Sequence, residues 1–278
     1  MQAELLLFDV GNTSIKVGMA DESHMLAAYT LPANVPHTAD SLGLTLASLL
    51  GHAGVAPEGL RACVACSVVP SMDPVLAGAV ARFVGCPLLR AVDDLPVPLD
   101  NRYERPAEVG ADRLVAAYAA RRAFPEAASL VVADFGTALT LDCVSGEAYL
   151  GGLIFPGPGT ALAALASHAA KLPPVSMDVT AEEPTPGRDT VTSIRHGLFF
   201  GYVSISEGLC ARLGRQLPAP VRTVATGGFA QAIAQASAVF DAVVPELLLE
   251  GLRLLYHEVA DQARDACKPG DPGKKEKA

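Results

Sequence analysis

The chain has 278 residues, of which 50% are hydrophobic and 18% are charged, so it can form one large domain or two ordinary ones with buried cores. Its formal net charge of −9 argues against nucleic acid as a partner, because nucleic-acid binding needs a basic surface. The N-terminus lacks the charged region and length of a signal peptide, and the later apolar stretches are too short to span a bilayer. We therefore expect a cytoplasmic protein without a membrane partner.

The first half of the chain alternates between strand-like segments and segments with helical periodicity. The strand-like runs are short, apolar and end in turn-forming residues, whereas the helical segments are longer and rich in Ala and Leu. The expected elements are strands at 5–8 and 15–19, a helix at 41–52, a strand at 62–69, a helix at 73–84, a loop at 93–106 and a helix that ends near 124.

The second half continues the alternation and ends in a Lys-rich tail. The expected elements are strands at 130–134 and 140–144, a helix from about 159 to about 171, a loop at 173–187, a helix at 190–213, a strand at 221–225 and helices that start near 230 and 247. This order predicts an α/β protein with an N-terminal domain (1–118), a C-terminal domain (119–267) and a disordered tail (268–278).

Six cysteines are scattered along the chain. Two of them, Cys63 and Cys66, have CxxC spacing, but no second pair is present to complete a zinc site. Both lie in an apolar, strand-like run, so we interpret them as buried thiols rather than as metal or redox groups.

Two short sequences, one in each half, resemble each other. Residues 6–13 read Leu-Leu-Phe-Asp-Val-Gly-Asn-Thr, and residues 131–138 read Val-Val-Ala-Asp-Phe-Gly-Thr-Ala. In each, an apolar strand stops at an aspartate, a turn follows, and a second strand begins. We call residues 9–13 the first acidic turn and residues 134–137 the second acidic turn. Such a duplication indicates two similar domains that each contribute one hairpin turn to a cleft between them.

The first acidic turn has residue types suited to a nucleotide phosphate. Gly11 permits a tight turn of backbone N–H groups because it tolerates positive φ. Asn12 and Thr13 supply hydrogen-bond donors, and Lys16 supplies a positive charge. Asp9 cannot bind phosphate directly, but it can hold Mg²⁺, which bridges phosphate oxygens. An ordinary hairpin turn would use similar residues, so this turn alone leaves both interpretations open.

The second acidic turn and a third glycine-rich segment favour the nucleotide interpretation. Asp134-Phe135-Gly136-Thr137 directly follows a strand, as the first turn does, and Thr226-Gly227-Gly228 follows a third buried strand. Two such turns facing one cleft would grip a polyphosphate from both sides, and the glycines would give a base or ribose a surface. The combination resembles the acetate kinase–sugar kinase–Hsp70–actin superfamily. That resemblance implies two ribonuclease-H-like domains with an ATP-binding cleft between them.

Within that superfamily the chain resembles the type III pantothenate kinases over nearly its whole length. The further segments that carry the resemblance are Ser67–Pro70, Tyr103–Pro106, Gly110–Arg113, Gly151–Gly157 and Leu249–Leu252. The Gly-Ala-Asp-Arg tetrad between the two acidic turns is the most specific of them. The resemblance implies ATP-dependent phosphorylation of pantothenate on its primary hydroxyl, the first step of coenzyme A biosynthesis.

The resemblance also implies roles for individual residues. Asp112 would be the general base for the attacking hydroxyl, and Arg113 would form a bidentate pair with the substrate carboxylate. Tyr103 and Thr190 would contact the substrate. Asp134 would bind a monovalent cation, potassium or ammonium, and the protein would be a homodimer.

The complete sets implied in this way are larger. The residues expected at the nucleotide and its Mg²⁺ are Asp9, Val10, Gly11, Asn12, Thr13, Ser14, Ile15, Lys16, Gly136, Thr137, Thr226, Gly227 and Gly228. The residues expected at the substrate are Tyr103, Gly110, Ala111, Asp112, Arg113 and Thr190.

Each substrate-site role has a structural alternative. The helix dipole favours a carboxylate such as Asp112 at a helix N-terminus in any protein. Arg113 could form a surface salt bridge, Tyr103 could be a packed ring, and Thr190 could be a helix N-cap. Two other functions share the fold: a phosphatase or sugar kinase of the same superfamily, and a nucleotide- or pantothenate-binding regulator without catalysis. The aspartates of both acidic turns and Asp112 are all present, which argues against the regulator, and a phosphatase would not need the Gly-Ala-Asp-Arg tetrad, so we favour the kinase.

Overall fold

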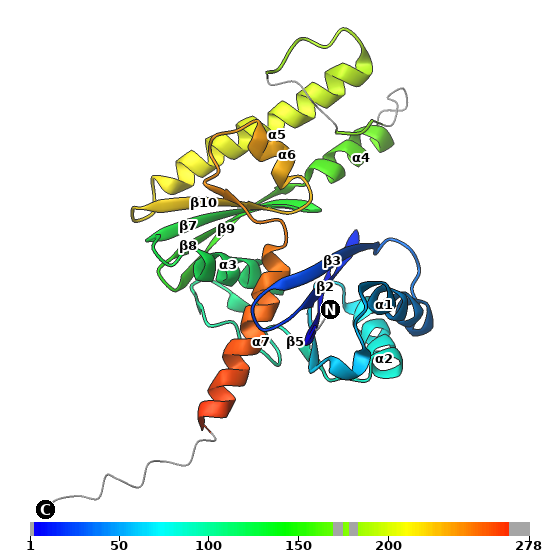
Figure 1. The fold of residues 1–278 in the computed structure, drawn as a ribbon. Coiled ribbons are helices and arrows are strands. Elements are labelled where there is room, and N and C mark those ends of the chain that lie inside the picture. The colour runs from blue at the N-terminus through cyan, green and yellow to red at the C-terminus, as the bar shows by residue number, and fades with distance from the viewer. Residues whose placement is uncertain (1–2, 169–174, 178–182, 267–278) are drawn as a thin grey trace, which may run out of the picture.

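The computed structural model describes residues 3–168, 175–177 and 183–266. Two mixed β-sheets, each with its own layer of helices, make up the α/β fold (Figure 1). No helix in these described ranges is long and apolar enough to cross a membrane. The predicted tail at 268–278, the end of the helix expected to reach 171, and part of the expected loop at 173–187 lie outside the described residues.

The first sheet has five strands in the order β3-β2-β1-β4-β5. The central strand β1 is antiparallel to β2 and parallel to β4, so the β1–β2 hairpin turn lies at the same sheet edge as the C-terminal end of β4. The strands are β1 (Leu5–Val10), β2 (Ser14–Ala20), β3 (Met25–Pro32), β4 (Ala62–Ser67) and β5 (Leu88–Arg90).

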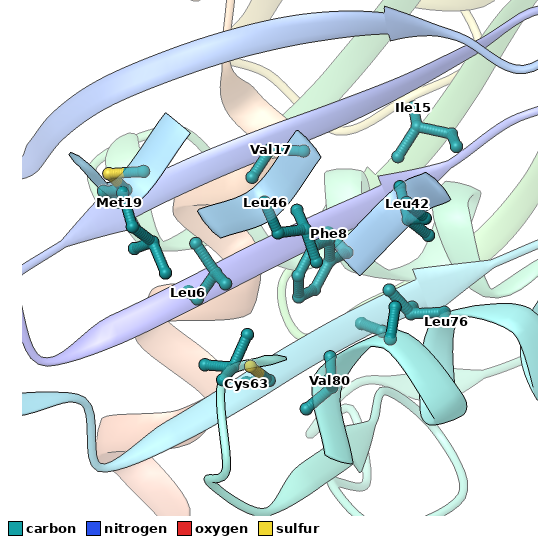
Figure 2. Packing of buried hydrophobic residues seen from close by; sticks show 14 of the residues in the cluster. Leu6, Phe8, Ile15, Val17, Met19, Leu42, Leu46, Cys63, Leu76 and Val80 are labelled. Carbon is teal, nitrogen blue, oxygen red and sulfur yellow. The ribbon is translucent and has the colours of Figure 1, made fainter. Parts of the chain in front are cut away.

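Helices α1 (Ala39–Ala53) and α2 (Asp73–Phe83) cover one face of this sheet. Alternate residues of the strands, such as Phe8, meet leucines of α1 in a fully buried core (Figure 2). The two helices pack closely because Gly43 of α1 has no side chain, and a Cβ there would overlap the Phe83 ring. This burial fixes which face of β1 points toward α1 and α2.

The second sheet has six strands in the order β11-β10-β7-β8-β9-β6. The helices α4 (Pro158–His168), α5 (Thr190–Gly214) and α6 (Ala230–Gln235) lie on one side of it (Figure 1). The strands are β6 (Asp100–Asn101), β7 (Ser129–Phe135), β8 (Ala138–Ser145), β9 (Ala148–Pro156), β10 (Val221–Thr226) and β11 (Ala242–Val243).

Helices α3 (Ala111–Ala123) and α7 (Leu247–Ala266) connect the two sheets. Val115 of α3 packs in the cluster on the first sheet, whereas Leu114 packs in the cluster on the second. Along α7, Leu249, Leu252 and Leu255 face the first sheet. The predicted boundary between residues 118 and 119 falls inside α3, a helix that both halves share, and the division into 1–118 and 119–267 stays a prediction.

The predicted fold class, an α/β protein with two sheet-and-helix halves, is confirmed, and most predicted elements are present within a few residues. Two strands of normal length were missed. β3 is a half-exposed edge strand with few β-branched residues, and β9 contains Gly151 and Gly152 next to a register shift opposite Cys143 and Val144. A glycine pair weakens the sequence signal of a strand, because glycine has no side chain to contribute to the alternation of apolar and polar residues.

The predicted burial of Cys63 and Cys66 is confirmed. The two side chains alternate across the sheet, so Cys63 packs in the cluster beneath α1 and α2 and Cys66 in the cluster beneath α7. The Sγ atom of Cys63 lies 3.3 Å from that of Cys86, and not beside Cys66.

Candidate active site

A cavity of about 690 Å³ lies between the two halves. Residues of both acidic turns line it, together with the start of α3 and the glycine-rich end of β10. Of the predicted site residues, those that line the cavity are Asp9, Gly11, Asn12, Thr13, Ser14, Lys16, Asp112, Arg113, Asp134, Gly136, Thr137, Thr226, Gly227 and Gly228. Those that do not are Val10, Ile15, Tyr103, Gly110, Ala111 and Thr190.

The first acidic turn is a hairpin closed by the Gly11 N–H, which donates to the Ser14 carbonyl at 3.0 Å. Val10 and Ile15 flank it as a buried cross-strand pair, so they anchor the turn rather than contact a ligand. Gly11 does not use the positive φ that glycine tolerates, because it is not among the glycines with positive φ. Glycine fits here for a different reason: a Cβ would lie only 3.3 Å from the Ser14 carbonyl oxygen.

The second acidic turn has the same closing bond, from the Gly136 N–H to the Ala138 carbonyl at 3.0 Å. The start of α4 is bound to this turn, since the Thr160 hydroxyl donates to the Thr137 carbonyl at 2.6 Å. The hydroxyls of Thr13 and Thr137 are hydrogen-bonded to each other at 2.8 Å. The two acidic turns therefore meet directly at the exposed mouth of the cavity.

Gly227, after β10, does adopt positive φ, at +92°. A Cβ at this position would overlap the Asp134 carboxylate and the Phe135 backbone. Thr226 pairs with Asp134 in the parallel β7–β10 ladder, so the register of these strands brings the next residue, Gly227, close to Asp134. Gly227 therefore lets the β10–α6 connection pass close to the Asp134 carboxylate.

The two turn aspartates are unusual electrostatically. Burial raises the pKa of Asp9 to about 7 and that of Asp134 to about 6. Lys16 lowers both pKa values, while repulsion from Asp134 and Asp112 adds to the rise of the Asp9 pKa. A cation bound between such carboxylates would relieve the repulsion, so the pair is suited to holding positive charge.

Lys16 also binds a residue far away in the sequence. Its Nζ donates to Glu246 Oε2 at 3.2 Å and to the Pro245 carbonyl at 3.3 Å, just before α7. The contact joins the first sheet to the connection that follows β11. Our sequence reasoning missed Glu246, because nothing local in the sequence indicates a pairing over 230 positions.

Asp112 lies in the first turn of α3, and its side chain folds back over the helix start. Its Oδ1 accepts the Arg113 N–H at 2.8 Å, and a Cβ on Gly110 would overlap this oxygen. Burial raises the pKa of Asp112, whereas the Arg113 N–H acts against the rise. Both interpretations of Asp112 fit the geometry, since it is a helix-terminal carboxylate that also lines the cavity.

Arg113 is engaged inside the protein. Its Nε and Nη2 donate to Asp142 Oδ1 at 3.0 and 2.6 Å, so the surface salt-bridge alternative is wrong. Asp142 is a second residue that sequence reasoning missed, although it also lines the cavity. The available signal was a charged residue in the middle of the apolar strand 140–144.

Tyr103 and Thr190 lie outside the cavity lining. The half-buried Tyr103 ring packs on Gly151, where a Cβ would come within 3.1 Å of it. Thr190 is exposed at the start of α5, but it is not the N-cap: Asp189 accepts the Thr192 N–H at 2.9 Å and caps the helix. The substrate contacts of Tyr103 and Thr190 stay predictions.

Within the part of the chain that the structure describes, no group of three or more His, Cys, Asp or Glu side chains is placed to hold a metal ion. A metal at Asp9 or a monovalent cation at Asp134 would therefore need ligands besides acidic side chains. Phosphate oxygens, water and backbone carbonyls are the oxygen donors that Mg²⁺ normally uses alongside one or two carboxylates. The donor set is compatible with an ion that arrives with the nucleotide.

Comparison with known structures shows the fold. A protein assigned to the Baf family of transcriptional activators, from Campylobacter jejuni, has a TM-score of 0.56 at 19% identity, covering 92% of this chain and 99% of that one. Component A of (R)-2-hydroxyglutaryl-CoA dehydratase from Acidaminococcus fermentans has a TM-score of 0.55 at 14% identity, covering 92% and 98%. At these identities the likeness concerns the fold alone.

Sequence comparison shows the family. The family model for type III pantothenate kinase matches residues 5–212. A type III pantothenate kinase from Desulfovibrio desulfuricans is 66% identical over 258 residues, which cover 93% of this chain and 98% of the relative. The matched region contains both acidic turns and the Gly-Ala-Asp-Arg tetrad. The chain belongs to the type III pantothenate kinase family.

Proposed function

We propose that this protein phosphorylates pantothenate on its primary hydroxyl at the expense of ATP, producing 4′-phosphopantothenate in the first step of coenzyme A biosynthesis. The observation that carries the proposal is one cavity lined by both turn aspartates, Lys16, Asp112 and Arg113. The names of the relatives that match nearly the whole chain agree with this reaction. Phosphoryl transfer depends mainly on positioning and charge stabilisation, which such a cavity supplies.

The triphosphate would lie between the two acidic turns. The hydroxyls of Thr13 and Thr137 meet there, and each can donate to a phosphate oxygen instead of to the other. Lys16 lines the same space and offsets phosphate charge. Asp9 would hold Mg²⁺ directly or through water, and Asp134 would bind the monovalent cation. Mg²⁺ would neutralise charge on the transferring phosphoryl group.

Asp112 would act on the acceptor alcohol. Its carboxylate takes the hydroxyl proton while the oxygen attacks the γ-phosphorus, and ADP leaves on the opposite side. The raised pKa of Asp112, caused mainly by burial, makes it a better proton acceptor than an exposed aspartate. Arg113 would bind the carboxylate at the other end of pantothenate and so orient the hydroxyl.

We also propose a homodimer. Apolar side chains gather in the exposed segment of β9 and on the neighbouring α4: Leu153, Ile154, Phe155 and Leu165. Ile154 is 66% exposed and lies in a part of β9 that β6 does not pair, and such an exposed apolar strand segment is unfavourable unless a partner covers it. Light scattering should give the mass of two chains, and Ile154→Asp should shift the protein toward the mass of one chain.

The reaction is tested by ADP release with and without pantothenate and with and without potassium or ammonium. We expect release that requires pantothenate in the parent and a loss of at least about a hundredfold in Asp112→Asn. Asp40→Asn is a matched control, because Asp40 also lies in the first turn of a helix but is exposed and pairs with Arg82. ATP hydrolysis indifferent to pantothenate would favour the phosphatase, and pantothenate binding without turnover would favour the regulator.

A further inference from the structure

A buried polar cluster lies beneath the start of α3, where β8 and β9 pair. It consists of Arg113, Asp142 and Tyr149, which come from three different elements. Asp142 Oδ1 accepts three hydrogen bonds: two from the Arg113 guanidinium, and one from the Tyr149 hydroxyl at 2.7 Å. A single carboxylate oxygen is therefore saturated by two partners.

We propose that Asp142, assisted by Tyr149, is a positioning residue that fixes the guanidinium of Arg113 for the carboxylate of the substrate. This inference rests on the proposed function, because it takes pantothenate as the ligand of Arg113. It assigns a role to two residues that lie outside the Gly-Ala-Asp-Arg tetrad.

The ion pair between Arg113 and Asp142 is buried. The side chains of Arg113 and Asp142 are 9% and 4% exposed, and Tyr149 is fully buried. Removing two charges from water is costly, and a buried pair of this kind often stabilises a fold no better than apolar residues would. Stability alone is therefore a weak reason for placing the pair here, whereas fixing a cation at the cavity wall is a specific use of it.

Asp142 binds only some of the N–H donors of Arg113. Nε and Nη2 form one edge of the planar guanidinium, and Asp142 occupies that edge. The adjacent edge, with one N–H on each Nη, keeps its fork geometry and can receive a carboxylate in a bidentate manner. Among the described residues none accepts a hydrogen bond from Nη1. Because Arg113 lines the cavity, that edge is the part of the side chain left for a ligand.

The backbone around Asp142 is closely packed. A Cβ on Gly152 would lie 2.8 Å from Asp142 Oδ1 and would overlap the Leu141 carbonyl. The paired strands β8 and β9 therefore approach each other over this carboxylate only because Gly152 has no side chain. The guanidinium also lies 5.9 Å from the centre of the Tyr149 ring. Arg113 is thus held by two neighbours, the Asp142 carboxylate along one edge and the Tyr149 ring beside it.

The test compares two ligands that differ only at the carboxylate. Pantothenate carries it, whereas pantothenyl alcohol has a hydroxymethyl group instead and keeps the acceptor hydroxyl. Calorimetric titrations with Mg²⁺ and a non-hydrolysable ATP analogue give both affinities. We expect Asp142→Asn to weaken pantothenate about tenfold to a hundredfold and pantothenyl alcohol less than about twofold.

Tyr149→Phe is the gentler variant, because it removes one hydrogen bond and leaves the ion pair in place. We expect it to weaken pantothenate about threefold to tenfold. Tyr118→Phe is its matched control: Tyr118 is buried and donates to Glu258 at 2.5 Å, but it lies outside the cavity lining. The control should leave both affinities unchanged. Asp142→Asn added to Arg113→Met should cause no further loss, since the effect passes through Arg113.

The outcomes separate the two proposals. If the parent binds pantothenate and the variants lose affinity for both ligands equally, or for neither, the positioning role is wrong while the proposed function stands. If the parent binds no pantothenate, the proposed function fails and the inference fails with it. Should Asp142→Asn not fold, Tyr149→Phe and its control decide the question.

Discussion

The two acidic turns are built alike but are not equivalent. In both, the glycine N–H after the aspartate strand donates to a carbonyl across the turn at 3.0 Å. Their lengths differ: four residues, 11–14, separate the last paired residues of the first hairpin, and three residues, 136–138, separate those of the second. The shift of one residue changes what stands opposite each aspartate.

Asp9 pairs across its hairpin with Lys16, whereas Asp134 pairs with Thr140. The first turn therefore carries its own positive charge, and the second has a hydroxyl in the same place. Lys16 lowers the pKa of both aspartates, but it belongs to the first hairpin and is held there by Glu246. The difference supports our proposal that a monovalent cation from solution binds at the second turn, which has no lysine of its own.

Removing the charge of the first turn should have the largest effect. Lys16→Met keeps an unbranched side chain of nearly the same length but removes a positive charge from the cavity that would hold the triphosphate. We expect kcat/KM for ATP to fall by about a hundredfold to a thousandfold, a magnitude typical for loss of a charge-stabilising donor. Steady-state kinetics with saturating pantothenate measure it. Arg61→Met, which breaks the surface pair with Glu4, is the control, and a loss below about threefold in Lys16→Met would contradict the role of Lys16.

The next effect concerns stability and pH in the ligand-free protein. Asp9 has a pKa of about 7 in the folded state against 3.8 as its ordinary value, so between these values the folded state binds more protons than the unfolded state. The free energy of unfolding should therefore fall as pH rises from about 4 to about 7. Over this pH range the free energy of unfolding should fall by about 2–4 kcal/mol less in Asp9→Asn than in the parent.

Urea unfolding at pH 5 and pH 8, in EDTA and without nucleotide, measures the difference. Asp9→Asn should be more stable than the parent at pH 8, and the advantage should shrink at pH 5. Asp134, with a pKa of about 6, should give a smaller effect of the same sign when changed to Asn. Parallel pH profiles for the parent and both variants would show that the turn aspartates do not titrate in this range.

The duplication of the acidic turns could be read from the sequence, but their difference could not. The strands around both turns, the cavity between them and the place of Asp112 follow from local patterns that the structure reproduces. The partners of Lys16 and Arg113 do not, because Glu246 and Asp142 are brought to them by tertiary packing over long sequence separations. The local sequence gives the positions of the charged residues along the chain, but the tertiary fold determines which of them form ion pairs.

The same limit applies to backbone conformation. The sequence indicated that Gly11 tolerates positive φ, but the first acidic turn closes without a positive φ at Gly11, whereas Gly227 adopts one. The reason at Gly227 is the approach of another strand to Asp134, which no local pattern contains. A glycine in a turn can thus be required by a contact as well as by a dihedral angle.

Giving the second turn its own cation would test the comparison directly. In Thr140→Lys the lysine would stand opposite Asp134 as Lys16 stands opposite Asp9. We expect the activation by potassium or ammonium to fall about tenfold, toward equal rates with and without the salt. The measurement is kcat over a potassium series at constant ionic strength, with Thr140→Gln as the uncharged control. Unchanged activation in Thr140→Lys would mean that the cation is bound elsewhere.

The smallest effect is expected where the two turns touch. Thr13 and Thr137 share one hydrogen bond at 2.8 Å in the ligand-free protein, but in the complex each hydroxyl would donate to its own phosphate oxygen, a stronger, charge-assisted bond. Each change to Val should therefore raise KM for ATP about threefold to tenfold. The double variant decides between the two arrangements. If the hydroxyls act on separate phosphates, the free-energy losses add. If the two hydroxyls serve only to bind each other, the second substitution should not raise KM for ATP any further. The contact between the turns would then be structural and would not be replaced by contacts with the nucleotide.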